Sequence, residues 1–155
     1  MDFQVIIDNL PLYFQGLQVT ILLVITSLIL GLCLALPIAL LATSKNRWVR
    51  IVPKAYIYFF RGTPLLVQMF MIYHGMGQFE AVHESFLWVI FKQAYACALL
   101  AFALNTAAYT AEILRGTIEQ TAFGEIEAAK ACGMSNAMIY RRIILPSTFR
   151  RALPA

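Results

Sequence analysis

An uncharged run of 24 residues, 19–42, constrains the fold of this chain more than any other feature of its sequence. As an α-helix, the run would be about 36 Å long at about 1.5 Å per residue. That length exceeds the hydrocarbon core of a bilayer, which is roughly 30 Å thick. Gly31 and Pro37 lie inside the run, and membrane helices tolerate both where neighbouring helices satisfy the loosened backbone. The run therefore predicts a membrane-spanning helix.

Two further apolar regions follow, at residues 55–74 and 94–114. The first is interrupted by an Arg-Gly-Thr-Pro sequence, and the second contains Asn105, Tyr109 and Glu112. The composition agrees, because 61% of the residues are hydrophobic and 13% are charged, against about 45–50% and about 25% in soluble domains. These features predict an all-α membrane protein, a transmembrane helical bundle with three spans.

The basic residues are distributed unevenly about these spans. Four lie between the first and second spans, six follow the third, one lies between the second and third, and Arg61 lies within a span. Because cytoplasmic loops of membrane proteins are enriched in Lys and Arg, residues 43–54 and 115–155 are predicted to be cytoplasmic. The N-terminus is then outside, and the segment before Gln18 is predicted to lie along the outer interface as an amphipathic helix.

The cytoplasmic segment 121–146 is too polar to span a membrane and favours helix. Its first helix is expected to stop at Gly133 in a left-handed conformation. Ser135 can then cap a second helix, which runs towards Pro146. The pattern predicts a helix–turn–helix elbow, and the small Ala128 and Ala129 would let a partner surface approach closely.

The spacing within this segment resembles the EAA loop of ABC importer permeases. The matching positions are Glu127, Ala128, Ala129, Gly133, Ile143, Leu145 and Pro146. In that family the loop forms a coupling helix that sits in a groove of a separate ATP-binding subunit. The resemblance therefore implies an ATPase-coupling role for these residues and an ABC ATP-binding subunit as a partner. Thr121 departs from the pattern, because the group usually has Pro there, and it implies a looser entry turn.

Residues 60–68 and 104–113 resemble the histidine/glutamine/arginine group of polar amino acid permeases, and residues 75–79 resemble its arginine branch. The resemblance implies that residues 1–155 form a permease domain of the bacterial inner membrane. It also implies a second permease subunit, itself or a paralogue, and a periplasmic amino-acid-binding protein. Family members continue through about two more spans, which this sequence lacks.

Sequence patterns of enzymes are absent. There is no GxxxxGK[ST] phosphate loop and no credible catalytic group or metal-ligand spacing. We therefore expect no enzyme activity, no nucleic-acid partner and no cofactor bound by this chain, with ATP and Mg²⁺ held by the partner ATPase. The three cysteines are predicted to be small packing residues (Cys33, Cys97 and Cys132). His74 and His83 are predicted to be solvated or interfacial, away from partners.

Asn105, Tyr109 and Glu112 follow an i, i+4, i+7 spacing and therefore share one helical face. Ionisable residues within spans usually face the bundle interior or a water-filled path. This face is predicted to line a substrate pathway, with Glu112 attracting a cationic amino acid. Alternatively, Glu112 pairs with Arg115 or Arg61. Gln68 is predicted to line the same path, or else to form hydrogen bonds between helices.

The function that follows is a permease subunit of an ATP-driven importer, forming the membrane pathway for polar, cationic amino acids delivered by a periplasmic binding protein. The alternative is a regulatory or assembly subunit in the membrane, which docks an ATPase through the same loop without transporting.

Overall fold

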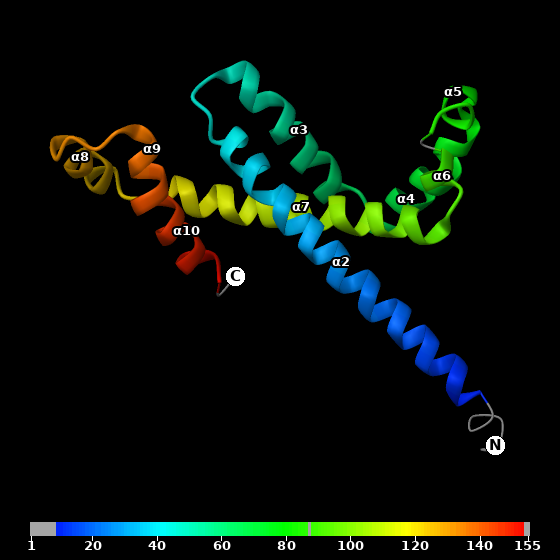
Figure 1. The fold of residues 1–155 in the computed structure, drawn as a ribbon. Coiled ribbons are helices and arrows are strands. Elements are labelled where there is room, and N and C mark those ends of the chain that lie inside the picture. The colour runs from blue at the N-terminus through cyan, green and yellow to red at the C-terminus, as the bar shows by residue number, and fades with distance from the viewer. Residues whose placement is uncertain (1–8, 87, 154–155) are drawn as a thin grey trace.

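The computed structural model describes residues 9–86 and 88–153, and these residues form helices and turns without a strand. Two long helices cross, and shorter helices extend from both ends of one of them (Figure 1). The elements are α2 (Leu10–Ala42), α3 (Arg47–Gly62), α4 (Leu65–Phe70), η1 (Met71–Gly75), η2 (Met76–Gln78), α5 (Glu80–His83), α6 (Trp88–Phe91), α7 (Ala94–Glu119), α8 (Phe123–Ala131), α9 (Asn136–Ile139), η3 (Tyr140–Ile144) and α10 (Leu145–Ala152).

Among the described residues, α2 and α7 are the helices long and apolar enough to cross a membrane. The predicted spans 19–42 and 94–114 lie inside them. However, α2 begins at Leu10, with Pro11 in its first turn. The prediction of a separate interfacial helix before Gln18 is therefore wrong for residues 10–17, because Gln15 and Gly16 lower the hydropathy of this stretch without ending the helix. Residues 1–8 lie outside the described part of the chain.

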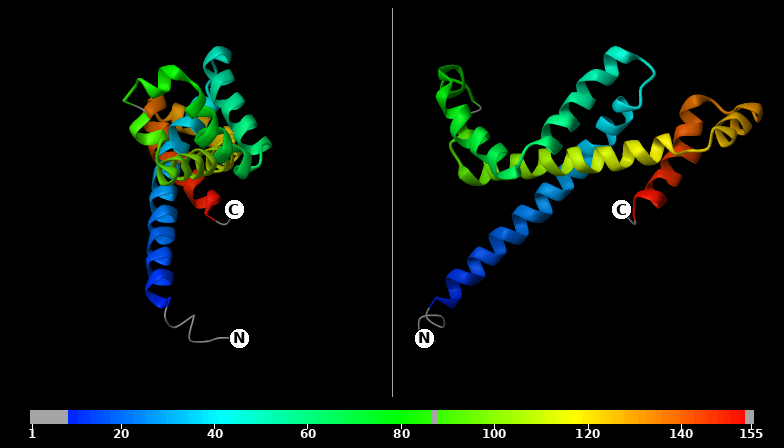
Figure 2. Two further views of the ribbon diagram at one scale, coloured as in Figure 1. Left: turned by 90° about the vertical axis from the view of Figure 1, so that its right-hand side faces the viewer. Right: turned by 180° about the vertical axis from the view of Figure 1, so that it is seen from behind.

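The two halves of α2 have different surroundings. Its first half extends away from the other helices in every view (Figure 2). Its buried residues all lie in the second half: Ser27, Gly31, Ala35, Ala39 and Ala42. The first four of these recur at every fourth position and so form one face of small residues.

Small residues of α7, including Ala103 and Ala107, are buried as well. The crossing is closest at Gly31, where an added Cβ would lie 2.8 Å from the Thr106 Cβ and 3.1 Å from the Ala103 carbonyl oxygen. Because lipid supplies no hydrophobic force between helices, close approach of small residues is what holds such a crossing together.

The predicted second span, 55–74, is divided among α3, α4 and η1. The break falls at Thr63 (φ −113°, ψ 140°) and Pro64 (φ −61°, ψ 138°), which are both extended. Proline disfavours the α conformation in the residue before it, so the Arg-Gly-Thr-Pro sequence ends one helix and starts another. The α3 helix also begins at Arg47, eight residues before the predicted start, where Asn46 caps it by accepting a hydrogen bond from the Trp48 N–H.

The hydrophobic core lies where α2, α3, α7 and the segment after α7 meet. We name residues 123–152, from α8 to α10, the elbow. Ala39 and Ala42 of α2 pack there with Ile118 of α7 and with Ile139 and Ile144 of the elbow. The elbow is therefore built onto the ends of α2 and α7 by buried contacts.

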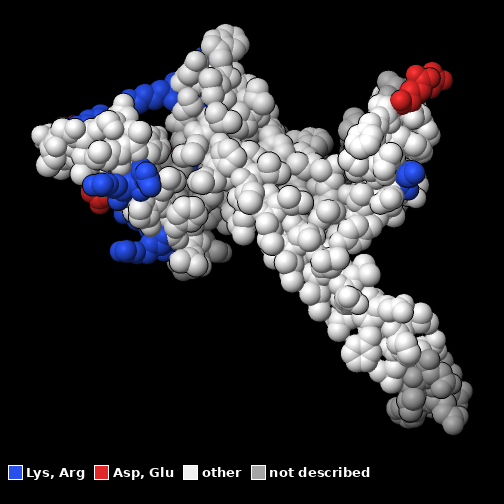
Figure 3. Space-filling model, viewed as in Figure 1, with Lys and Arg blue, Asp and Glu red and all other residues white. Residues whose placement is uncertain are grey.

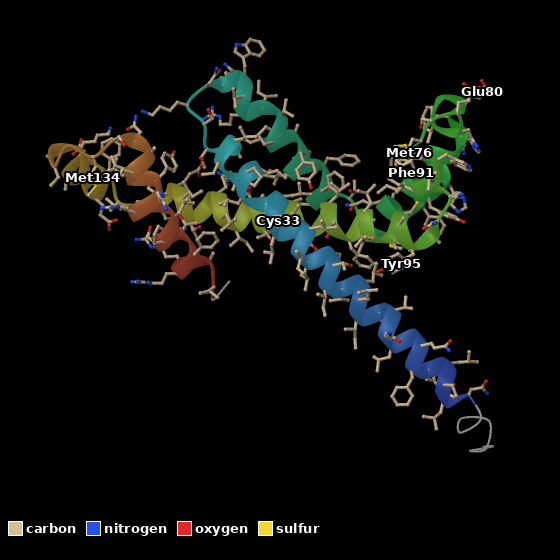
Figure 4. All side chains as sticks on the ribbon, viewed as in Figure 1. Cys33, Met76, Glu80, Phe91, Tyr95 and Met134 are labelled. Carbon is tan, nitrogen blue, oxygen red and sulfur yellow. The ribbon has the colours of Figure 1, made fainter. Side chains whose placement is uncertain are left out.

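The opposite end of α7 carries a hairpin of short helices, with Glu80 at its tip (Figure 4). The His83 imidazole lies 3.6 Å from the Trp88 ring centroid, with its Nε2 atom 2.8 Å from the Gly77 carbonyl oxygen. His74 stacks on Phe70. Both histidines are exposed, as predicted, but the expectation that they lie away from partners is wrong, because neighbouring turns bring aromatic rings beside them.

The cysteine prediction is confirmed for Cys97, which is buried. It is wrong for Cys33 and Cys132, which are exposed. Cys33 lines an open hollow between α2, α7 and α10, and Cys132 follows the last turn of α8. The sequence pattern did not show which helical face points outwards.

Candidate coupling surface and polar cluster

The elbow turns at Gly133, which has a φ of 75°. The Met134 N–H donates to the Ala129 carbonyl oxygen at 3.1 Å, and the Gly133 N–H donates to that of Lys130 at 2.9 Å. These two bonds form a Schellman motif, which requires a left-handed residue at the Gly133 position. The predicted left-handed stop is confirmed. A side chain here would meet no atom within 4 Å, so the requirement comes from the backbone.

The second helix of the elbow begins where expected, because the Ser135 side chain accepts a hydrogen bond from the Met138 N–H. This helix continues through a π-helical turn at 140–144 into α10. Pro146 lies in the first turn of α10, so the helix runs beyond it to Ala152. Proline lacks a backbone N–H, and its first-turn position in α10 needs none. At the far end, Arg151 Nη1 donates to the Gln120 carbonyl oxygen at 3.0 Å, which ties α10 back to the end of α7.

The predicted coupling residues divide into two sets by exposure. Ala129 is 6% exposed and packs into the core, and Ile143 and Leu145 are half-buried. Glu127, Ala128, Gly133 and Pro146 are exposed. The exposed residues are free to meet a partner, while Ala129 and Ile143 pack in the core at the helix ends.

Thr121, where the resemblance implied a looser turn, lies just before the elbow and is 8% exposed. Its N–H donates to the Ile118 carbonyl oxygen at 3.1 Å. The Oγ1 atom has no hydrogen-bond partner among the described residues.

The side chain of Gln68 is 2% exposed and lies against the break between α3 and α4. Its Nε2 atom donates to the carbonyl oxygens of Phe60 at 2.8 Å and Thr63 at 3.0 Å. Asn105 Nδ2 donates to Gln68 Oε1 at 3.2 Å and to the Phe60 oxygen at 3.4 Å. Of the two roles weighed for Gln68, the structure shows hydrogen bonding between helices, and this polar cluster satisfies carbonyls that the break leaves without donors.

Glu112 is at the centre of a charged cluster about two turns further along α7 than Asn105. Arg115 donates to both of its carboxylate oxygens, at 2.8 and 2.7 Å, and Arg61 Nη1 lies 3.5 Å from Oε1. The Arg61 guanidinium also lies 5.4 Å from the Tyr109 ring centroid. Tyr109 itself is half exposed. The pairing proposed as the alternative role of Glu112 is thus present in this conformation.

An open hollow lies beside the charged cluster, lined by Lys54, Arg61, Glu112 and Arg115 among other residues. Its lining carries three basic groups and one carboxylate. Lys54 was missed as a member of this site, although it lies seven residues before Arg61 and thus on the same helical face. Tyr56 was missed as well, and its hydroxyl donates to the Leu104 carbonyl oxygen at 2.6 Å.

Most Lys and Arg side chains gather over the elbow and the adjoining loop after α2, with acidic side chains among them. Acidic side chains are also seen on the hairpin at the other end, near a basic one (Figure 3). No group of three or more His, Cys, Asp or Glu side chains able to hold a metal occurs in residues 9–86 and 88–153.

Comparison with known proteins identifies the class to which this arrangement belongs. Residues 27–155 match the family model described as "binding-protein-dependent transport system inner membrane component". The chain is 48% identical over 156 residues to the nopaline transport system permease protein NocM of Agrobacterium fabrum, covering 100% of this chain and 65% of that protein. It is 45% identical over 143 residues to the histidine/lysine/arginine/ornithine transport system permease protein HisM of Escherichia coli K12, covering 92% of this chain and 60% of that protein.

A solved structure agrees with these relatives. The structure titled as an amino acid ABC transporter with histidines matches with a TM-score of 0.81 and 34% sequence identity, over 99% of this chain and 68% of that chain. Our chain thus spans about two thirds of the length of these proteins. The match covers α7 and the elbow, and the chain belongs to the family of binding-protein-dependent transport system inner membrane components.

Proposed function

We propose that this chain contributes the membrane pathway of an ABC importer for polar, cationic amino acids. The observation that carries the proposal is the elbow: a fixed turn on the ends of two spanning helices, with Glu127 and Ala128 exposed. A separate ATPase would dock on that surface, and a binding protein would deliver the substrate. The related proteins named above are permeases of transport systems, whereas a purely regulatory subunit has no support among them.

Gly133→Val tests the coupling role. A β-branched residue tolerates a φ of 75° badly, so the variant should distort the elbow while leaving the spans intact. In the complete transporter we expect normal membrane insertion, with loss of most of the substrate-stimulated ATP hydrolysis. Gly124→Val is the matched control, because Gly124 also has open space around it and has no positive φ. Normal ATPase co-purification and normal stimulated hydrolysis for Gly133→Val would contradict the proposal.

Glu112→Gln tests the cationic substrate. If the carboxylate acts on substrate, uptake of arginine or lysine should fall about tenfold, equivalent to ~1.4 kcal/mol, with a smaller effect on a neutral amino acid. Glu119→Gln is the control, because Glu119 also pairs with Arg115, at 2.7 Å, but is 51% exposed. Uptake must be normalised to inserted protein. Unchanged normalised uptake of the cation would remove Glu112 from the pathway.

The proposed topology has the N-terminus outside and both the loop after α2 and the elbow in the cytoplasm. Cysteines introduced at Ser44 and Ser85, in a background without the native cysteines, should label from opposite sides in intact cells. Labelling of position 44 from outside would overturn this orientation.

A further inference from the structure

A second hollow lies between the elbow and the end of α2, separate from the charged cluster. Its volume is about 540 Å³, within the roughly 300–1,000 Å³ of typical small-ligand sites. The end of α2 and the loop after it form one wall, and α8, α9 and η3 form the other. We name it the elbow hollow.

The elbow hollow is lined by apolar residues on one side and by polar and basic residues on the other. Leu40, Ile139 and Ile144 form its apolar base. Ser44 and Tyr140 contribute hydroxyl groups, and Lys45 and Lys130 contribute ammonium groups, while none of the lining residues is acidic. Both lysine side chains are exposed and have no ion pair within the described part of the chain. The hollow therefore offers two positive charges above an apolar floor.

The apolar side of the hollow continues onto the surface of the spanning helix. Leu41 lines the hollow and is 48% exposed, and Leu34 lies seven residues before it, on the same face, and is 41% exposed. A ligand with a long apolar tail could lie along this face while its polar end stays beside the lysines. A soluble anion would leave this apolar strip unused.

We propose that the elbow hollow binds an anionic phospholipid. Its phosphate lies between Lys45 and Lys130, and its acyl chains follow Leu41 and Leu34 down α2. Basic pockets at the membrane surface bind anionic headgroups through charge, with a gain of about a fivefold affinity per basic residue. The lipid would thereby join the elbow to the membrane on the side where α2 ends.

Photocrosslinking tests this assignment. Phe123 lines the hollow and is 74% exposed, so p-benzoylphenylalanine can replace it without disturbing the core. The full-length permease, assembled with its partner subunits, is placed in nanodiscs of phosphatidylcholine with a minor fraction of phosphatidylglycerol and irradiated. Mass spectrometry of the permease should show phosphatidylglycerol adducts enriched at least fivefold over the bulk lipid ratio. The same reagent at Phe14, exposed on the isolated half of α2, should report the bulk ratio.

Two double variants separate the lysines of the hollow from general basic charge. Lys45→Gln with Lys130→Gln should abolish the enrichment. Arg47→Gln with Arg141→Gln removes the same charge from exposed positions outside the lining and should preserve it. Adducts in the bulk ratio at position 123, enrichment that survives the lysine changes, or crosslinks to another polypeptide in place of lipid would each overturn the proposal. The adduct is read on the permease itself and does not depend on transport.

Discussion

Proline ends the helix in one apolar region of this molecule and not in another. Pro37 lies inside α2, which runs without a break from Leu10 to Ala42. Pro64 follows Thr63, where the chain is extended and α3 ends. In both places the backbone loses a donor, so the presence of proline alone does not explain the difference.

The surroundings do explain it. Ala35 and Ala39, on either side of Pro37, are 0% exposed and pack at the crossing with α7. A bend there would separate the two helices. At Pro64 the amides of Gln68 and Asn105 donate to carbonyls that the break exposes. A membrane helix can therefore break where side-chain donors replace the lost hydrogen bonds, and it continues where close packing requires it to be straight.

The largest loss of stability is expected from a substitution that disrupts the packing of α2 against α7 near Pro37. Gly31→Leu would force side-chain atoms into Thr106 and the Ala103 backbone, since even a Cβ would be 2.8 Å from Thr106. We expect a loss of about 3 kcal/mol or more, at or above the upper end of usual overpacking costs. Unfolding in mixed micelles, monitored by tryptophan fluorescence, measures it.

Gly16→Leu is the matched control in the isolated half of α2. An added Cβ at Gly16 meets no atom within 4 Å, so stability should not fall, and loss of a glycine from a helix interior should raise it by about 0.5–1 kcal/mol. Equal losses for the two variants would show that the crossing does not hold α2.

An intermediate effect is expected from removing the donors at the second proline. Gln68→Leu leaves the Phe60 and Thr63 carbonyls without their shortest side-chain donor. Because polar interactions between membrane helices are worth about 0.6–1.7 kcal/mol, the loss should be about 1–2 kcal/mol in the same unfolding assay. Gln18→Leu, at an exposed position of α2, should not destabilise the protein. A stable Gln68→Leu variant would mean that solvent or lipid headgroups satisfy the break.

The smallest effects should have opposite signs. Pro37→Ala restores one backbone hydrogen bond inside α2 and should raise stability by less than about 1 kcal/mol. Pro64→Ala removes a residue whose φ of −61° already suits proline and should lower stability by about 0.4–1 kcal/mol. Paired unfolding curves from one preparation are needed to resolve differences of this size. Changes of the same sign would show that the two prolines do not differ as the packing suggests.

The sequence predicted the parts of this fold that depend on near neighbours. The uncharged run and the third apolar region predicted the bodies of α2 and α7, because helix length and hydropathy are local. Gly133 and Ser135 took their predicted backbone roles for the same reason. The spacing of Ser27, Gly31, Ala35 and Ala39 also contained the crossing face, although the prediction did not use it.

The sequence did not predict which residues contact the site residues, because these contacts join distant parts of the chain. Gln68 and Asn105 are 37 residues apart, and their hydrogen bond depends on where α4 meets α7. Asn105, Tyr109 and Glu112 share a face as predicted, and that face meets the C-terminal half of α3, with an open hollow beside Glu112. The spacing of residues within one helix determines which side chains share a face. Which other helix packs against that face depends on contacts between residues far apart in the sequence.

The π-helical turn of the elbow holds one residue more than a regular helical turn would. Ile139 and Ile144, both buried, are five residues apart. At about 100° per residue, an α-helix would leave them about 140° apart, whereas the wider turn brings both onto one face. Deleting a single residue from 140–144 would place the two isoleucines four residues apart in a regular α-helix, about 40° apart and therefore still on one face. Thr148 would then stay in the interior, and Arg151 would stay beside the Gln120 carbonyl. In evolutionary terms, this stretch should accept the loss of one residue more readily than a regular α-helix would.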